Sequence, residues 1–329
     1  MLGLAVVSVV ALAAAMLAVV GYMIVLPRQP MHSAPPPLTS EQTALSDLLA
    51  QHVRAIASTP HNLDHYPALE AAACYIEQQL AAMGHRVLLH EYLVEDRPVR
   101  NIEVVIEAPA THPAMPTLVL GAHYDSPDDS PGANDNGSGV AALIEMARSL
   151  RNAPCPVARL RIVFFVNEEQ PWGKTDAMGS LRHARALSAS GERVIGMIAL
   201  ETLGHFSNEE GSQRFPAPFG LIYSDRGNFV AFVGLMRART LVHRCVRAFR
   251  SSASFPCIGG VAPAFIDGID LSDHWAYDHC GFPALMVTDT APFRNPHYHT
   301  RGDLPQTVDY DNLARVTEGL CAMVRTLEA

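Results

Sequence analysis

The 329-residue chain is 49% hydrophobic and has a formal net charge of -9 at neutral pH. This length allows one large α/β domain or two small ones, and the apolar content is ample for a sizeable core. Lysine and arginine are scattered along the chain and form no basic stripe, which excludes the usual surface of a nucleic-acid-binding protein. We therefore expect a globular protein that has no nucleic-acid partner.

The N-terminal segment is strongly apolar, because residues 2–26 contain no charged side chain. About 20 apolar residues span a bilayer as a helix, whereas the apolar region of a signal peptide has roughly 7 to 15 residues. The segment also lacks a preceding basic stretch and a clean Ala-x-Ala cleavage site. We predict that residues 1–27 form an uncleaved transmembrane anchor, and a cleaved signal segment ending near Ser33-Ala34 is the alternative.

Residues 28–40 are rich in proline among small and polar residues. Such a composition is typical of an extended linker, so we expect this segment to hold a folded domain away from the membrane. Arg28 is the basic side chain nearest to the apolar segment, and a single charge barely decides which way the segment crosses a membrane.

The six cysteines form no Cys-x-x-Cys pair, so we do not expect a structural zinc knot. Cys245 and Cys257 are close enough in sequence for a local disulfide. The alternative is that all six cysteines are buried thiols that pack as small apolar side chains.

The chain from Thr39 onward alternates between helical and strand patterns. Apolar spacing and capping residues predict helices at residues 39–58, 66–83, 137–151, 176–190, 227–250 and 310–327. Apolar or alternating runs predict strands at residues 86–93, 101–107, 117–121, 160–166, 194–200 and 283–288. This alternation predicts one α/β domain over residues 41–329, with a mostly parallel sheet covered on both faces by helices.

Side chains of metal-ligating types follow four of the predicted interior strands. In chain order they are His123 with Asp125 and Asp135, then Glu168 with Glu169, then Glu201, and finally His299. Imidazoles and carboxylates together suit zinc, and open α/β sheets gather ligands at the carboxyl ends of their strands. A single Glu or His in such a place is usually a solvated loop residue. Four such places at one edge of a sheet indicate a metal site.

The sequence around these side chains resembles the family of two-zinc aminopeptidases, whose relatives include bacterial leucyl aminopeptidases, glutamate carboxypeptidase and glutaminyl cyclase. The resemblance extends from about Thr59 to the C-terminus. Its most specific segments are His123-Tyr-Asp125, Gly132-Ala-Asn-Asp135-Asn-Gly-Ser-Gly139, Asn167-Glu168-Glu169, Leu200-Glu201, Ser272-Asp273-His274 and Tyr298-His299-Thr300. It implies a three-layer, zinc-exopeptidase-like fold with a mostly parallel mixed sheet between helices.

The resemblance implies two zinc ions per chain, Zn²⁺ being held by His123, Asp135, Glu169, Glu201 and His299. Asp135 would bridge the two ions, and the other four side chains would be terminal ligands. Glu168 would be the general acid and base, and Asp125 would orient the ring of His123. Glu201 stands where many members have Asp, which leaves the fine geometry open. His299 is preferred to His297 because it lies in the Tyr-His-Thr segment.

The function that the resemblance implies is a membrane-tethered metallo-exopeptidase. It would be an aminopeptidase that hydrolyses N-terminal residues of peptides through a hydroxide bridging the metals. One alternative is a glutaminyl-cyclase-like acyltransferase with one zinc, and another is a non-catalytic binding domain. Carboxypeptidase or dipeptidase action is also open. The resemblance further implies an extracytoplasmic catalytic domain, periplasmic or extracellular, and leaves the oligomeric state open.

Several short motifs are not expected to have the function that they suggest. A glycan on Asn136, in Asn136-Gly-Ser138, would block the site at Asp135. We expect Arg301-Gly-Asp303 to be an ordinary turn, and Ser272-Asp273-His274 either to support the site or to contact substrate. The chain has no Gly-x-Ser-x-Gly and no His-Glu-x-x-His, so serine hydrolases and zincins are excluded.

Overall fold

The computed structural model describes residues 18–25, 35–108, 115–216 and 219–328. In this part of the chain nine strands form one sheet with the order β1-β8-β7-β9-β6-β4-β5-β3-β2. The strands are β1 (Ile24–Val25), β2 (Leu88–Val94), β3 (Arg97–Ile106), β4 (Thr117–His123), β5 (Arg159–Phe165), β6 (Val194–Glu201), β7 (Val230–Leu235), β8 (Cys257–Ala262) and β9 (Ala284–Thr288).

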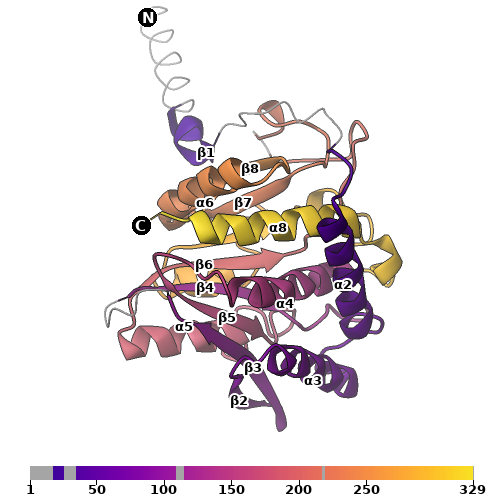
Figure 1. Ribbon diagram of the computed structural model, residues 1–329, viewed down its shortest axis with the longest axis vertical. Helices are drawn as coiled ribbons and strands as arrows, with labels where there is room; N and C mark the ends of the chain where they lie inside the picture. Colours follow the sequence, from indigo (N-terminus) through magenta and orange to yellow (C-terminus); the bar gives the residue numbers. More distant parts are fainter. Residues whose placement is uncertain (1–17, 26–34, 109–114, 217–218, 329) are drawn as a thin grey trace, which may run out of the picture.

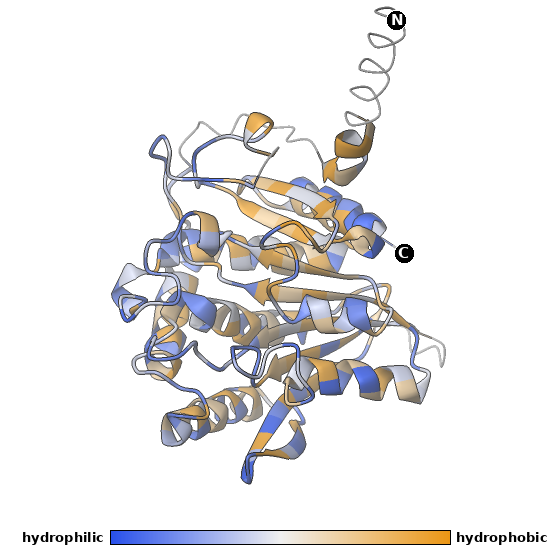
Figure 2. Cartoon of the chain, turned by 180° about the vertical axis from the view of Figure 1, so that it is seen from behind, coloured by the Kyte–Doolittle hydropathy of each residue, from blue (hydrophilic) through white to orange (hydrophobic). Residues whose placement is uncertain are grey.

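Helices cover both faces of this sheet (Figure 1). They are α2 (Ser40–Ile56), α3 (Tyr66–Ala82), α4 (Gly139–Leu150), α5 (Gly179–Ser190), α6 (Arg239–Ser252), α7 (His274–His279) and α8 (Tyr310–Thr326). The larger core cluster joins the sheet to α2, α3, α4, α6 and α8, and a second cluster joins its other face to α5 and α7. In Figure 2 the central strands are mainly hydrophobic, whereas the helices carry both hydrophobic and hydrophilic residues. The three-layer α/β architecture expected from the sequence is confirmed.

The four central strands, in the order β5-β4-β6-β9, are parallel to one another. All seven residues of β4 are buried, because helices cover the sheet on both sides of this strand. The long apolar runs in the sequence reflect this double burial. The carboxyl ends of the four strands consequently lie at one edge of the sheet.

The sheet as a whole is mixed rather than mostly parallel. Four of the eight strand pairs in the described part of the chain are antiparallel. β2 and β3 form a hairpin that adds to β5 in the antiparallel sense, and β7 runs antiparallel to β9. β2 and β3 follow one another through a tight turn, whereas β7 and β8, which are parallel to each other, are connected through α6.

The predicted helix at 227–250 is wrong over its first half. Residues 230–235 form β7, only residues 239–252 form α6, and β8 has no counterpart among the predicted strands. The run Phe229–Leu235 is apolar throughout, and a short run of this kind has no periodicity that separates a buried strand from a buried helix. In contrast, the predicted start of α2 is confirmed, since Thr39 and Gln42 form a reciprocal capping box.

The predicted anchor at residues 1–27 lies mostly outside the described residues, as does most of the predicted linker at 28–40. Residues 18–23 are helical, and β1 follows them at the edge of the sheet beside β8 (Figure 1). No helix within the described ranges is long and apolar enough to cross a membrane.

All six cysteines are free, so the local disulfide between Cys245 and Cys257 does not form. Both of these thiols are buried, as the alternative expects. Cys74, by contrast, is exposed, and Cys280 is partly exposed.

Candidate metal centre

The loop after β4 turns back so that Asp135 faces the end of the strand that it has just left. Gly132 makes this turn possible, because it has a positive φ of 67° and a Cβ there would lie 2.4 Å from the carbonyl oxygen of Asp135. Only glycine adopts this conformation in so little space. Asp135 and His123 are thereby brought to the same edge of the sheet.

The predicted ligands form two groups that share Asp135. In the first group, Nε2 of His123 lies 3.5 Å from Oδ1 of Asp135 and 3.3 Å from Oε2 of Glu201. In the second group, Nε2 of His299 lies 3.0 Å from Oδ2 of Asp135 and 3.7 Å from Oε2 of Glu169. Each oxygen of Asp135 thus faces a different histidine.

This arrangement fits divalent cations. Nitrogen and oxygen ligands lie about 2.0 to 2.2 Å from zinc, so two ligands of one tetrahedral ion are roughly 3.4 Å apart. The separations within the two groups scatter around that value. Oδ1 of Asp135 is moreover buried without a hydrogen-bond partner. A buried carboxylate oxygen without a partner is costly, and coordination to a cation would satisfy it.

The charge of the site also favours a bound cation. Burial, together with the neighbouring Asp135 and Glu168 carboxylates, raises the pKa of Glu169 well above its usual value. Burial likewise raises the pKa of Glu168 well above its usual value, with Glu201 contributing further. Several carboxylates placed together out of water repel one another, and bound cations would remove that repulsion.

Asp125 supports the site in a way that differs from the expectation. Nδ1 of His123 lies 3.0 Å from the carbonyl oxygen of Asp125 and 3.7 Å from its carboxylate oxygen Oδ1. The carboxylate instead accepts hydrogen bonds of 3.1 Å from the backbone N–H groups of Glu168 and Glu169. Asp125 therefore orients His123 through its carbonyl and fixes the backbone of two further site residues through its side chain.

Two buried aspartates belong to the site and were missed by sequence reasoning. Asp303, in the segment expected to be an ordinary turn, accepts backbone N–H bonds of 2.9 Å from Asn134 and 3.0 Å from Asp135. Asp289 accepts a bond of 3.0 Å from the side-chain amide of Asn134. Burial raises the pKa of Asp303 to about 7 and that of Asp289 to about 6. Both side chains hold the loop that presents Asp135.

The remaining motif residues are also placed. The Ser272 hydroxyl donates a 2.8 Å hydrogen bond to Oε2 of Glu201, so this motif supports a predicted ligand. Asn136 is buried and donates to the carbonyl of Leu200, which is incompatible with a glycan there. His297 belongs to neither ligand group.

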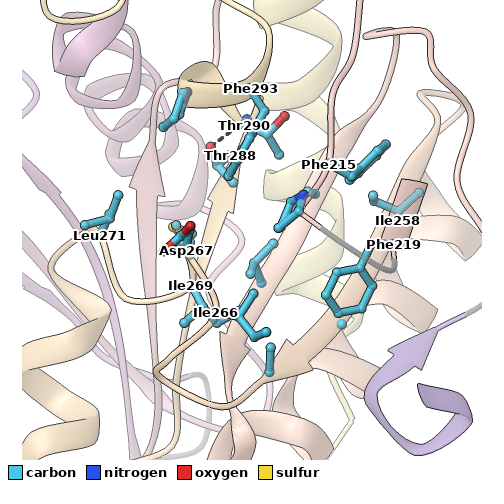
Figure 3. A pocket seen from close by; sticks show the side chains of 18 of the residues that line it. Phe215, Phe219, Ile258, Ile266, Asp267, Ile269, Leu271, Thr288, Thr290 and Phe293 are labelled. Carbon is cyan, nitrogen blue, oxygen red and sulfur yellow. Dashed lines mark hydrogen bonds between the residues drawn. The ribbon is translucent and has the colours of Figure 1, made fainter. Parts of the chain in front are cut away.

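A pocket opens beside the two ligand groups (Figure 3). Its lining includes Glu201 and Tyr298, and it encloses about 860 Å³ of empty space including its open mouth. Most of the remaining lining is apolar, for example Phe215, Ile258 and Phe293, which Figure 3 labels. The site therefore joins a cluster of metal-ligating groups to a space suited to an apolar group.

Comparison with known proteins assigns the chain to a family. The model of peptidase family M28 matches residues 101–324. The protein YfbL of Escherichia coli (strain K12) is 35% identical over 311 residues, which cover 91% of this chain and 90% of YfbL. A probable leucine aminopeptidase of Arthroderma otae is 29% identical over 211 residues, which cover 60% of this chain. The matching segment spans half (50%) of that aminopeptidase.

Solved structures show the same fold. The aminopeptidase from Aneurinibacillus sp. strain AM-1 matches with a TM-score of 0.66 at 16% identity, over 86% of this chain and 93% of that one. A glutaminyl cyclase from Fimbriiglobus ruber matches with a TM-score of 0.63 at 17% identity, over 92% and 100%. Since zinc metalloproteases and aminopeptidases are among the relatives, the family implies zinc and a metallopeptidase activity. The chain belongs to peptidase family M28.

Proposed function

We propose that the protein is a membrane-tethered aminopeptidase that uses two zinc ions to remove N-terminal residues from peptides. The observation that supports this most strongly is the pair of ligand groups that share Asp135. A carboxylate whose two oxygens face two different histidines is suited to span two cations. A single-zinc acyltransferase would need only one of these groups.

In this proposal His123 and Glu201 hold one cation, Glu169 and His299 hold the other, and Asp135 holds both. When bound, the two ions supply Lewis acidity, which lowers the pKa of a water molecule and polarises the scissile carbonyl. Ser272 and Asp125 keep their partners Glu201 and His123 in place before substrate arrives. Such supporting contacts strengthen metal binding, because the ligands need not be ordered when the ion enters.

Glu168 is the general base in this proposal. Its Oε2 lies 4.0 Å from Nε2 of His123, and Glu168 belongs to neither of the groups that share Asp135. The side chain is 16% exposed, so water or a substrate can reach it. It would take the proton of the attacking water and return it to the amine that leaves.

The apolar pocket beside Glu201 supports action on a terminal residue with a large apolar side chain. A pocket lined mainly by apolar groups next to a reaction centre favours such a side chain by burial. The named aminopeptidases among the relatives support cleavage at the N-terminal end. If the purified protein forms pyroglutamate from glutaminyl peptides and hydrolyses no peptide bond, the proposed function is wrong and the protein is a glutaminyl cyclase.

The apolar residues that precede β1 support a membrane tether, and we place the catalytic domain outside the cytoplasm, in the periplasm or the extracellular space. Protease added to cells whose outer membrane, where there is one, has been permeabilised should digest the domain in this orientation. Complete protection in such cells, with digestion after full lysis, would reverse the orientation.

Metal removal tests the proposed activity. The purified chain should hydrolyse aminoacyl-anilides, lose the activity on exhaustive chelation, and regain it when zinc is restored. Anilides with a blocked amino group serve as the control, since an aminopeptidase should leave them intact. Hydrolysis that survives complete metal removal would rule out the proposed chemistry.

A further inference from the structure

The N-terminal segment reaches the substrate side of the domain through β1. β1 pairs with β8 in the antiparallel sense, and Ile24 stands opposite Gly260. The backbone approach is close, because a Cβ on Gly260 would lie 3.1 Å from the carbonyl oxygen of Met23. Figure 1 shows β1 as the last strand on this edge of the sheet.

Ile24 is buried, with 9% of its surface exposed, and it packs in a cluster with Leu235, Ala262 and Ile269. It is also part of the lining of the apolar pocket, and that lining includes Glu201 as well. One continuous pocket therefore extends from a predicted zinc ligand to the N-terminal segment. In Figure 3 the indigo strand β1 is drawn at the lower right, past the labelled side chain of Phe219.

A second contact holds the segment in this position. The guanidinium of Arg239, at the start of α6, donates a 2.9 Å hydrogen bond to the carbonyl oxygen of Tyr22. It also lies 4.2 Å from the centroid of the Tyr22 ring, as a cation stacked on an aromatic face. Residues 22–25 are thus fixed to the domain by a strand pairing and by a side-chain clamp.

We propose that β1 is a wall of the substrate pocket, and that Ile24 helps to decide which terminal side chain the protein accepts. This inference rests on the proposed aminopeptidase function, and it assigns to the N-terminal segment a part in specificity besides attachment to a membrane. Because the pocket is apolar at this end, the accepted side chain is large and apolar, with Ile24 contacting its far end.

The test uses the full-length protein and three variants. Ile24→Trp fills the far end of the pocket and Ile24→Ala enlarges it. Val19→Ala is the matched control, because Val19 lies in the same segment, is 56% exposed and does not line the pocket. The rate constant kcat/KM is measured for alanyl, leucyl and phenylalanyl anilides, and binding of free L-phenylalanine is measured by calorimetry.

We expect Ile24→Trp to lower kcat/KM for the phenylalanyl substrate about ten-fold or more relative to the alanyl substrate, since a pocket discriminates side chains about ten-fold per methylene or better. Ile24→Ala should shift the ratio toward phenylalanyl over leucyl, and Val19→Ala should leave all ratios unchanged. A circular dichroism spectrum equal to that of the wild type would show that Ile24→Trp is folded. If Ile24→Trp loses all activity, the role of Ile24 is tested by Ile24→Ala and by the binding of L-phenylalanine.

The outcomes separate the two proposals. Suppose that the protein hydrolyses anilides, but that neither Ile24 variant changes the kcat/KM ratios between the substrates or the binding of L-phenylalanine. This result would overturn the role of β1 alone. If the protein does not hydrolyse the anilides but binds L-phenylalanine in a manner that depends on Ile24, the proposed function is overturned. The proposed role of β1 as a wall of the pocket is then retained. A wild-type protein that neither hydrolyses the anilides nor binds L-phenylalanine would contradict both.

Discussion

Several carboxylates at the metal centre hold backbone rather than metal. Asp303 accepts hydrogen bonds from the backbone N–H groups of Asn134 and Asp135. It lies 169 residues beyond Asn134 in the chain. Asp125 binds the N–H groups of Glu168 and Glu169 in the same manner. These hydrogen bonds fix the loops that present the predicted ligands.

Asp303→Asn tests this positioning role. The amide can accept only one of the two backbone N–H groups well, so Asp135 becomes less ordered. Loss of such a supporting contact typically weakens metal binding about 10- to 100-fold, and we expect a loss of zinc affinity in that range. Asp128→Asn, in the exposed part of the same loop, should leave the affinity unchanged. Equal zinc affinities in the two variants, from competition with a chelating dye, would contradict the role of Asp303.

Glu168→Gln tests the proposed general base. The amide cannot take a proton, so kcat should fall about 10³-fold, as is typical for the loss of a positioned acid or base. The zinc content should stay at the wild-type value, because Glu168 is outside the two groups that share Asp135. Full activity in this variant would show that another group moves the proton.

The sequence indicated the ligand residues more readily than their supports. His123, Glu169 and Glu201 lie at or just after the ends of apolar strands and have side chains that zinc prefers, so type and position mark them as candidates. The family resemblance then separates Glu169 from its neighbour Glu168. Asp303 does not follow an apolar strand and is not in a segment that suggests a metal ligand. Its role is to accept hydrogen bonds from a loop that is remote in sequence. Only the tertiary structure brings such an acceptor to its donors.

At the scale of elements, a buried charge cluster joins β3 to its neighbours away from the metal centre. Glu103 of β3 is fully buried and forms a 2.6 Å contact with Nε2 of His90, and it also contacts His183 and Arg161. Burial alone would raise the pKa of Glu103, but the hydrogen bonds from His183, His90 and Arg161 outweigh burial and hold that pKa well below its usual value. The charged form of Glu103 is therefore the form that stabilises the fold.

Glu103→Gln should lower the free energy of unfolding by about 3 kcal/mol at pH 7, since it removes one partner from a buried charge cluster. The pKa of Glu103 is depressed, so its contribution is complete above its ordinary value of 4.5 and is lost as the pH falls toward the folded value. The difference between wild type and variant should therefore shrink below pH 4.5. Denaturant titrations at several pH values measure it.

The matched control is Glu91→Gln, on the exposed surface of β2. An exposed substitution of this kind usually changes the free energy of unfolding by less than about 0.5 kcal/mol. A difference for Glu103→Gln that stays constant from pH 7 to pH 3 would mean that the charge of Glu103 does not stabilise the fold.

Elements with clear periodicity or capping were predictable, and short buried ones were not. α2 and α8 have long amphipathic patterns with capping residues, and both occur close to the predicted bounds. β7 and β8 are each six residues long and mostly buried. α6 packs on one face of these strands, and Phe215 and Tyr223 pack on the other. Because both faces are covered, the local sequence contains no alternation that would identify them as strands.

At the scale of the whole molecule, the parallel centre of the sheet explains why distant residues form one site. The strands β5, β4, β6 and β9 end at the same edge and deliver Glu169, His123, Glu201 and His299 to it. Open sheets place ligand sites at this edge, which is why the order of the motifs in the sequence could anticipate the site. The association of β1 with β8 could not be anticipated from the sequence. An apolar segment long enough to span a membrane has the same sequence pattern whether or not its last residues pair with a strand of the domain.

The zinc content of the purified full-length chain tests the two-metal proposal most directly. After removal of loosely bound metal, elemental analysis should give two zinc ions per chain in wild type and in Glu168→Gln alike, because both ligand groups are complete in each. Hydrolysis of aminoacyl-anilides should reach its maximum only when the second ion has bound. One zinc ion per chain in a fully active protein would contradict the proposed pair of ions bridged by Asp135.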